Sequence, residues 1–214
     1  MAVKTTAKPA RENAEENPPR RRILDAAFSA FMERGFAQTS TLEIATRARV
    51  SKRELYALVG SKQEMLAACI GERAQRLRMP AGLPEPRDRE TLARALETLG
   101  IQLLREISDP TVIAVFRLAI AEAVRAPEVA QALNSLGVEP SRAALREMMS
   151  RVRTAGLLDG DPAEMAEHFV GLLWGNLMTG LLLRTADRPT PREIARRASE
   201  AAAGLLRLFA KPTL

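Results

Sequence analysis

The sequence predicts an all-α fold. Ala, Leu, Arg and Glu dominate its 214 residues, and all four have high helix propensity. Residues that begin or end helices recur along the chain, whereas no segment alternates apolar and polar residues before a hairpin turn. We therefore expect helices throughout, without the fixed repeat that would indicate a solenoid.

Composition divides the chain into three parts. Residues 1–19 have no apolar periodicity, and we interpret them as a disordered arm. Residues 20–78 are expected to form a small helical domain that ends in a connecting helix. Three prolines and a glycine between Met79 and Pro86 break the helical pattern, so residues 88–214 are predicted to form a second, larger domain.

The small domain should open with a helix from about Arg20 that ends at Gly35, a residue suited to a left-handed C-terminal position. Three helix starts then follow at Ser40, Ser51 and Ser61, each with a glutamate three residues later whose carboxylate is expected to accept from the backbone N–H of that serine. Their spacing leaves room for two short helices and a tight turn before a third helix begins. This arrangement is a helix-turn-helix, whose second helix enters a DNA major groove.

The larger domain should consist of helices that begin at Asp-Pro, Thr-Pro or similar capping pairs and end at glycines or charged residues. The helix with the most apolar sequence is expected to be continuous from Pro162 to about Arg184. The expected helices span residues 88–107, 110–125, 127–137, 140–156, 162–184 and 191–209.

Charge is distributed unevenly between the two domains. Residues 20–78 hold 12 Lys and Arg against six Asp and Glu, which accounts for the whole net charge of +6. Residues 79–214 hold 17 of each sign and are neutral. A positive excess confined to the helix-turn-helix domain predicts double-stranded DNA as its partner.

Several functional classes are excluded by what the sequence lacks. The one cysteine, Cys69, cannot form an internal disulfide or a Cys-rich zinc site, and its apolar neighbours predict a buried structural thiol. No apolar signal segment follows the N-terminus, and the apolar run 169–183 is too short to span a bilayer. With one histidine, His168, and no nucleophile or phosphate-binding motif, we expect a cytoplasmic protein that is not an enzyme and holds no cofactor or metal. An interface or surface role is expected for His168.

The helix that begins after Ser51 is expected to read the DNA. Leu55, Leu58 and Val59 should face inward and leave the basic residues for the groove. Arg53 could pair bidentately with guanine O6 and N7, Lys52 could act as a point charge, and hydroxyls near the helix starts could bind phosphates. The residues predicted to contact DNA are Ser40, Thr41, Arg49, Ser51, Lys52, Arg53, Tyr56 and Lys62.

Two alternatives remain open for the basic residues. Lys52, Arg53 and Lys62 could form an ordinary solvated face. The run Arg20–Arg22 could extend into a flanking minor groove or simply be hydrated.

A family resemblance rests on many positions of the small domain. The matched positions read Ile23-Leu24-x-Ala26-Ala27, Phe31, Gly35-Phe36, Thr39-Ser40, Ile44-Ala45, Ala48-x-Val50-Ser51, Leu55-Tyr56, Gly60-Ser61-Lys62 and Met65-Leu66. This run resembles the N-terminal domain of TetR/AcrR-type transcriptional regulators. The resemblance implies an all-helical homodimer in which Tyr56 and Lys62 contact phosphates and the helix from Ser51 reads the groove.

The chain departs from the family pattern at the reading helix. Arg49 stands where the family usually has a turn glycine, Arg53-Glu54 replaces the common Gly-Thr, and Leu58-Val59 replaces an aromatic pair. A left-handed Arg49 would cost about 1 kcal/mol relative to glycine, which a phosphate contact could offset. Glu54 could accept a hydrogen bond from a cytosine amino group or serve only as a cap.

In the larger domain, Phe116–Glu122 followed by Pro127-Glu128 resembles the C-terminal domain of the AefR-like branch of this family. The resemblance implies that this domain binds a small molecule and dimerises. Core filling is the competing interpretation for each candidate, and Arg117 and Glu122 could simply pair with other charges. The candidate ligand-binding residues are Ile70, Phe116, Arg117, Ile120, Met148, Phe169, Leu173, Trp174 and Asn176.

A dimer interface is expected from the helix 162–184 and the final helix. Two glycines four residues apart share one helical face with larger apolar residues and would allow a close backbone approach. The small residues of the final helix would complete a four-helix interface. The predicted interface residues are Gly171, Gly175, Met178, Leu182, Ala198, Ala202 and Leu205.

These observations together predict a ligand-responsive repressor that binds a quasi-palindromic operator as a dimer and is released by a small, largely apolar or aromatic molecule. The alternative is a structural nucleoid-type DNA-binding protein without sequence preference.

Overall fold

The computed structural model of the protein describes residues 18–74 and 85–211, and all regular structure in these residues is helical. The elements are α1 (Pro18–Arg34), α2 (Thr41–Ala48), α3 (Lys52–Val59), α4 (Lys62–Ala74), α5 (Arg89–Ile107), α6 (Pro110–Glu122), α7 (Pro127–Leu133), the π-helical turn η2 (Asn134–Val138), α8 (Glu139–Thr154), α9 (Pro162–Trp174), α10 (Leu177–Leu183) and α11 (Pro191–Leu208). The predicted all-α fold is confirmed.

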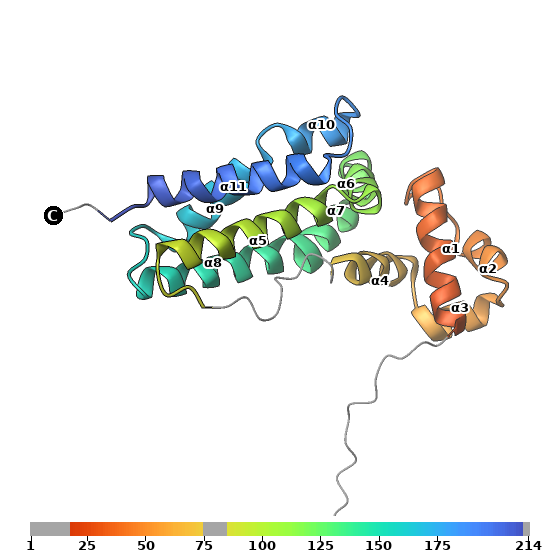
Figure 1. The fold of residues 1–214 in the computed structure, drawn as a ribbon. Coiled ribbons are helices and arrows are strands. Elements are labelled where there is room, and N and C mark those ends of the chain that lie inside the picture. The colour runs from red at the N-terminus through yellow and green to blue at the C-terminus, as the bar shows by residue number, and fades with distance from the viewer. Residues whose placement is uncertain (1–17, 75–84, 212–214) are drawn as a thin grey trace, which may run out of the picture.

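Figure 1 shows α1, α2 and α3 gathered at one end of the molecule and the longer helices α5, α8, α9 and α11 stacked in the body. Helix α4 lies between the two. Helix α1 begins at Pro18, two residues earlier than expected. The rest of the predicted arm 1–19, the expected end of the connecting helix near Arg78 and most of the boundary 79–86 lie outside the described residues.

The helix starts of the N-terminal domain follow from local capping. Ser40 Oγ, Ser51 Oγ and Ser61 Oγ accept hydrogen bonds at 3.0–3.2 Å from the backbone N–H three residues later. Gly35 has a φ of +82° and ends α1, as predicted. Because each cap satisfies an N–H that the helix leaves unpaired, short helices such as α2 and α3 begin at defined residues.

The predicted end of a helix at Gly137 is wrong. The chain runs from α7 through η2 into α8 without a break, and the N–H of Glu139 donates to the carbonyl of Asn134, five residues earlier. Gly137 keeps a negative φ and is buried where η2 packs against α4. The wider π turn carries the chain past Pro140, which has no N–H to donate.

The predicted continuous helix 162–184 is also wrong. Gly175 adopts a φ of +45° and separates α9 from α10. The C-terminal carbonyls of α10 accept hydrogen bonds from a distant side chain, since Arg117 donates to Leu181 O at 2.6 Å and to Leu182 O at 3.0 Å. This contact fixes the C-terminal end of α10 on α6.

Two hydrophobic cores organise the chain, and they do not coincide with the predicted domain boundary. One core joins α5, α8, α9, α10 and α11 in the body and includes Ile113 of α6. The other joins α1–α4 with buried residues of α6 and α7, among them Val115, Leu118 and Val129. Helices α6 and α7 therefore belong in sequence to the second domain but pack on α1 and α4.

No helix among the described residues is both long and apolar enough to cross a membrane.

Candidate nucleic-acid interface

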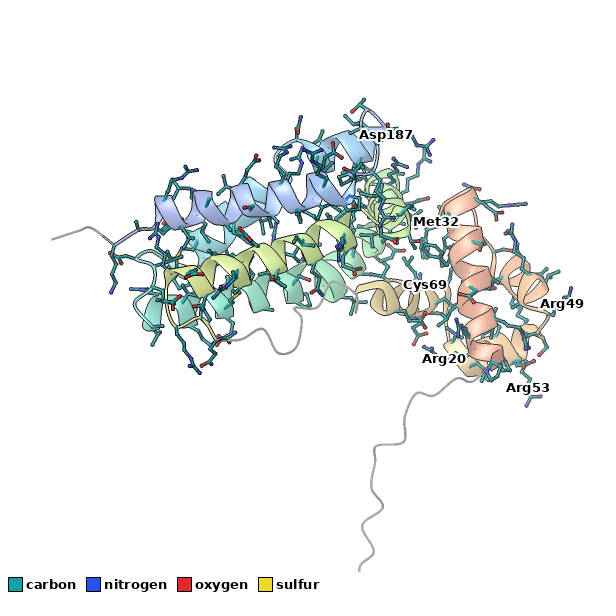
Figure 2. The ribbon with its side chains drawn as sticks, viewed as in Figure 1. Arg20, Met32, Arg49, Arg53, Cys69 and Asp187 are labelled. Atoms are coloured by element: carbon teal, nitrogen blue, oxygen red, sulfur yellow. The ribbon has the colours of Figure 1, made fainter. Side chains whose placement is uncertain are left out.

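Helix α3 has one buried face and one exposed face. Leu55 is fully buried, and Leu58 and Val59 are half-buried. Lys52, Arg53, Tyr56 and Ala57 are exposed, so the expected division of α3 into an inward and an outward face is confirmed. Figure 2 shows Arg49 and Arg53 projecting outward at the end of the molecule far from α9 and α11.

Ion pairs fix α2 against α1. Arg47 Nη2 lies 2.7 Å from carboxylate oxygens of both Glu33 and Glu43, and Arg34 Nε lies 3.2 Å from Glu43. The hydrogen bond from Arg47 lowers the pKa of Glu33 below its usual value. Because Arg34 and Arg47 are paired within the domain, they are less available to a partner than Arg49, Lys52 and Arg53.

Arg49 ends α2 in the left-handed conformation, with φ 56° and ψ 47°, as its place at a usual glycine position predicts. Its backbone N–H donates to Thr46 O at 3.2 Å, which tightens the turn between α2 and α3. The side chain is exposed. A left-handed backbone conformation at a non-glycine residue costs about 1 kcal/mol of conformational free energy. Arg49 therefore stands in the turn although its own backbone conformation is unfavourable there.

Polar groups gather where α2 begins. The Tyr56 hydroxyl lies 3.3 Å from Thr41 Oγ1, and Lys52 Nζ lies 5.9 Å from the centre of the Tyr56 ring. Ser40 caps the same helix start. Hydroxyls and the N–H groups of a helix N-terminus favour anions, so this corner is suited to a DNA phosphate.

Lys62 is engaged within the protein. Its Nζ donates to Phe36 O at 2.9 Å, Thr39 O at 3.1 Å and Ala37 O at 3.4 Å, and it lies 4.5 Å from the centre of the Phe36 ring. An ammonium group has three N–H donors, and these contacts use all of them. In this conformation Lys62 holds the loop that precedes α2.

The candidate ligand-binding residues are not brought together at one place. Ile70 and Phe116 pack in the core that contains α1–α4, whereas Met148, Phe169, Leu173 and Trp174 pack in the core of the body. Ile120 and Asn176 are exposed, and Arg117 binds the end of α10. One polar atom stands out, since Trp174 Nε1 is buried without a hydrogen-bond partner among the described residues.

The three interface residues predicted on the final helix face the interior of their own chain, which corrects that part of the predicted dimer interface. Ala198, Ala202 and Leu205 are buried in the core of their own chain, where α11 packs on α5 and α9. A Cβ at Gly100 of α5 would lie 3.0 Å from Ala198 Cβ, so the close approach occurs within the chain. The remaining four predicted residues are exposed or half-buried, namely Gly171, Gly175, Met178 and Leu182.

Sequence reasoning missed an exposed apolar stripe on the same helices. Leu172 of α9 and Leu208 of α11 are 41% and 59% exposed, and a Cβ at Gly171 would meet nothing within 4 Å. His168, one turn before Gly171 and Leu172, is exposed as well, which agrees with a surface or interface role. The spacing of His168, Gly171, Leu172 and Gly175 on one helical face was the available signal.

Two other residues lie in the core shared by α1–α4, α6 and α7. Cys69 is buried as expected, and its Sγ lies 3.4 Å from Leu24 O. Glu122 is 8% exposed and ends α6 against Gly35, where a Cβ would approach its carboxylate closely. Its Oε2 has no hydrogen-bond partner among the described residues, which disfavours the alternative that Glu122 pairs with another charge.

Comparison with known proteins places these features in a family. Residues 23–69 match the model of bacterial regulatory proteins of the tetR family, and residues 94–211, more than half of the chain, match the AefR-like transcriptional repressor C-terminal domain. No curated protein matches the chain.

Solved structures agree with this assignment. The Flavonoid-responsive Regulator FrrA is 28% identical, with a TM-score of 0.78 over 92% of this chain and all of its own. TetR regulators from Agrobacterium tumefaciens and Pseudomonas syringae pv. tomato are each 26% identical, with TM-scores of 0.72 and 0.70. The alignments cover 91% and 92% of this chain and 95% and 100% of theirs. The chain therefore belongs to the TetR family of bacterial DNA-binding transcriptional regulators, which are not enzymes, and carries an AefR-like C-terminal domain.

Proposed function

We propose that this regulator is a ligand-responsive repressor that binds a quasi-palindromic operator as a homodimer and leaves it when a small, largely apolar molecule binds. The observation that carries the proposal is the exposed basic end of α3. The side chains of Arg49 and Arg53 have no hydrogen-bond or ion-pair partner among the described residues, while Leu55 on the opposite face is fully buried. We expect such a regulator to act in the cytoplasm, where bacterial DNA lies.

The side chains divide into two groups by their chemistry. Arg53, at the N-terminal turn of α3, has the planar guanidinium that pairs with guanine O6 and N7, and Lys52 can contact the same groove. The second group lies around the starts of α2 and α3 and is suited to contacts with phosphates. It consists of Ser40, Thr41, Arg49, Ser51 and Tyr56. The first group would select the sequence and the second would fix the protein on the duplex.

Lys62 would act differently from the other candidates. In the free protein it holds the loop 36–39, so its contribution to DNA binding would be to keep the start of α2 in place. A phosphate contact by Lys62, which the family resemblance implies, would require it to release at least one of these carbonyl oxygens.

The homodimer is proposed to form through the exposed stripe on α9 and α11. Leu172 and Leu208 supply apolar area, and Gly171 offers open space for a partner helix. A two-fold axis through this stripe would present two copies of α3 to DNA, and half-sites about one helical turn apart would fit such a pair.

The effector is proposed to be an aromatic molecule with oxygen acceptors. Trp174 Nε1 is a buried donor without a partner among the described residues, and an unmade hydrogen bond costs about 1–3 kcal/mol. A ligand oxygen that accepts from this N–H would remove that cost. The 28% identical relative is named as responsive to flavonoids, which are aromatic compounds that carry oxygen substituents.

Selection from random duplexes tests the proposal. The full-length protein should enrich a two-fold related sequence with guanine in each half-site, and aromatic oxygen-containing compounds should then release the complex. If binding enriches no sequence, the nucleoid-type alternative is correct and the repressor proposal is wrong.

A further inference from the structure

The three Ser-x-x-Glu helix starts share one sequence pattern, but their carboxylates are used in three ways. Glu64 Oε2 accepts a hydrogen bond from the backbone N–H of Ser61 at 2.7 Å, and this bond lowers the pKa of Glu64. Glu43 accepts from Arg47 and Arg34. Glu54 donates its backbone N–H to Ser51 Oγ at 3.0 Å, but its carboxylate has no partner among the described residues. Capping and ion pairing therefore account for two of the three glutamates and leave Glu54 unexplained.

Glu54 lies where a negative charge is unfavourable for binding DNA. It is exposed on the first turn of α3, directly after Lys52 and Arg53. This turn is the part of a reading helix that contacts base edges. A carboxylate that enters a major groove is repelled by the phosphates on both sides, so it weakens binding to every sequence that offers it no hydrogen-bond donor.

The major groove offers only two such donors, the N4 amino group of cytosine and the N6 amino group of adenine. An ionised carboxylate can only accept hydrogen bonds. Adenine presents the N7 acceptor beside its amino group, and this nitrogen would repel a carboxylate. Cytosine presents its amino donor without a neighbouring acceptor on the same base, so it is the better partner.

We propose that Glu54 is a specificity-determining residue that accepts a hydrogen bond from the N4 amino group of a cytosine in each operator half-site. The inference rests on the sequence-specific operator binding proposed above. Arg53 and Glu54 would then form a donor–acceptor pair on adjacent residues, with Arg53 directed at a guanine and Glu54 at a cytosine.

The test compares Glu54→Ala and Glu54→Gln with a matched control, Glu64→Gln. Glu64 occupies the same position of the next helix start, but its carboxylate is engaged by its own cap. Operators are first selected with the wild-type protein. Affinities of all four proteins are then measured on duplexes that carry each of the four base pairs at each position, with circular dichroism to verify folding.

The wild-type protein should prefer cytosine at one position of each half-site by about 5- to 100-fold. Glu54→Ala should lose this preference and bind non-operator DNA about twofold more tightly, because a charge that repels phosphates is gone. Glu54→Gln should prefer adenine at the same position, since an amide can donate to N7 and accept from N6. Glu64→Gln should lower the unfolding temperature without changing any base preference.

A second measurement leaves the protein unchanged. The selected cytosine is replaced by 2-pyrimidinone, which lacks the N4 amino group. This base replacement should weaken DNA binding by the wild-type protein several-fold more than it weakens binding by the Glu54→Ala variant.

Three results would overturn the inference. If the Glu54 variants keep every base preference and lose only stability, as the Glu64 control does, Glu54 is a helix cap and nothing more. If 2-pyrimidinone weakens the wild type and Glu54→Ala equally, the amino group is not read by Glu54. If the wild type selects no sequence at all, the repressor proposal fails and this inference fails with it, an outcome that the selection step alone identifies.

Discussion

The end of the molecule formed by α1, α2 and α3 and the body formed by α5, α9 and α11 are held together in different ways. At the DNA-binding end, charged groups clamp short helices: Arg47 joins α1 to α2, and Lys62 binds three backbone carbonyls of the loop before α2. In the body, small residues let long helices approach, as at Gly100 and Ala198. Polar clamps can fix a surface whose outer side chains stay free for a partner, whereas close packing leaves no space for any added atom.

The largest effect is expected where a methyl group is added to the close packing of the body. A Cβ at Gly100 would lie 2.9 Å from Leu173 Cδ2 and 3.0 Å from Ala198 Cβ. Gly100→Ala should therefore lower the free energy of unfolding by about 1–3 kcal/mol, measured by urea denaturation.

Gly71→Ala is the matched control for this prediction. Gly71 is also helical, but a Cβ there would meet nothing within 4 Å. The change should stabilise the protein by about 0.5–1 kcal/mol through helix propensity alone. Equal effects of the two substitutions would show that α5 and α11 are not closely packed at Gly100.

A smaller effect is expected from removal of the polar clamp at the DNA-binding end. Lys62→Ala deletes the hydrogen bonds to the loop 36–39, and charge-assisted bonds contribute about 1–2 kcal/mol in a partly exposed place. We expect that loss in urea denaturation, together with weaker binding to all DNA sequences.

Lys52→Ala provides the contrast, because Lys52 is exposed on α3. It should change stability by less than about 0.5 kcal/mol and yet weaken DNA binding, measured by fluorescence anisotropy. If Lys52→Ala proved the more destabilising of the two, the assignment of Lys62 as the clamp would be wrong.

The smallest effect concerns acid. Arg47 lowers the pKa of Glu33 from its usual 4.5, so the contribution of this ion pair is fully present above that pH and is lost as the pH falls through the lowered pKa. After correction for the pH dependence of intrinsic amide exchange, the protection of the amides in α1 and α2 should fall in this range, and Glu33→Gln should remove part of the change. The same exchange profile in both proteins would exclude Glu33 as its source.

The two regions also differ in how far their structure follows from nearby residues. The start of α3 could be predicted because its cap, Ser51 with the N–H of Glu54, spans only three residues. The left-handed Arg49 could be predicted as well, because it stands where the family usually has a turn glycine. The cap that Glu64 forms with the backbone N–H of Ser61 is equally local and was predicted. The pairing of Glu43 with Arg34 could not be predicted, because it depends on which arginines the fold brings near.

Predictions for the body failed where distant helices decide the outcome. Gly175 interrupts an apolar run that continues on both sides, and a contact with Arg117 fixes the C-terminal end of α10. Phe116 and Met148 were both candidates for the ligand site, but α6 and α8 place them in different cores. The face of α11 that carries small residues can pack closely on any helix, and the helix that packs there is α5 of the same chain.

The central claim is that the exposed end of α3 reads bases while the groups around it bind phosphates. Affinities of Arg53→Ala and Tyr56→Phe on the panel of operator variants test it most directly. Arg53→Ala should relax the preference at one base pair of each half-site, whereas Tyr56→Phe should weaken binding to all sequences alike. A uniform loss of affinity from Arg53→Ala, with the sequence preference retained, would contradict the account.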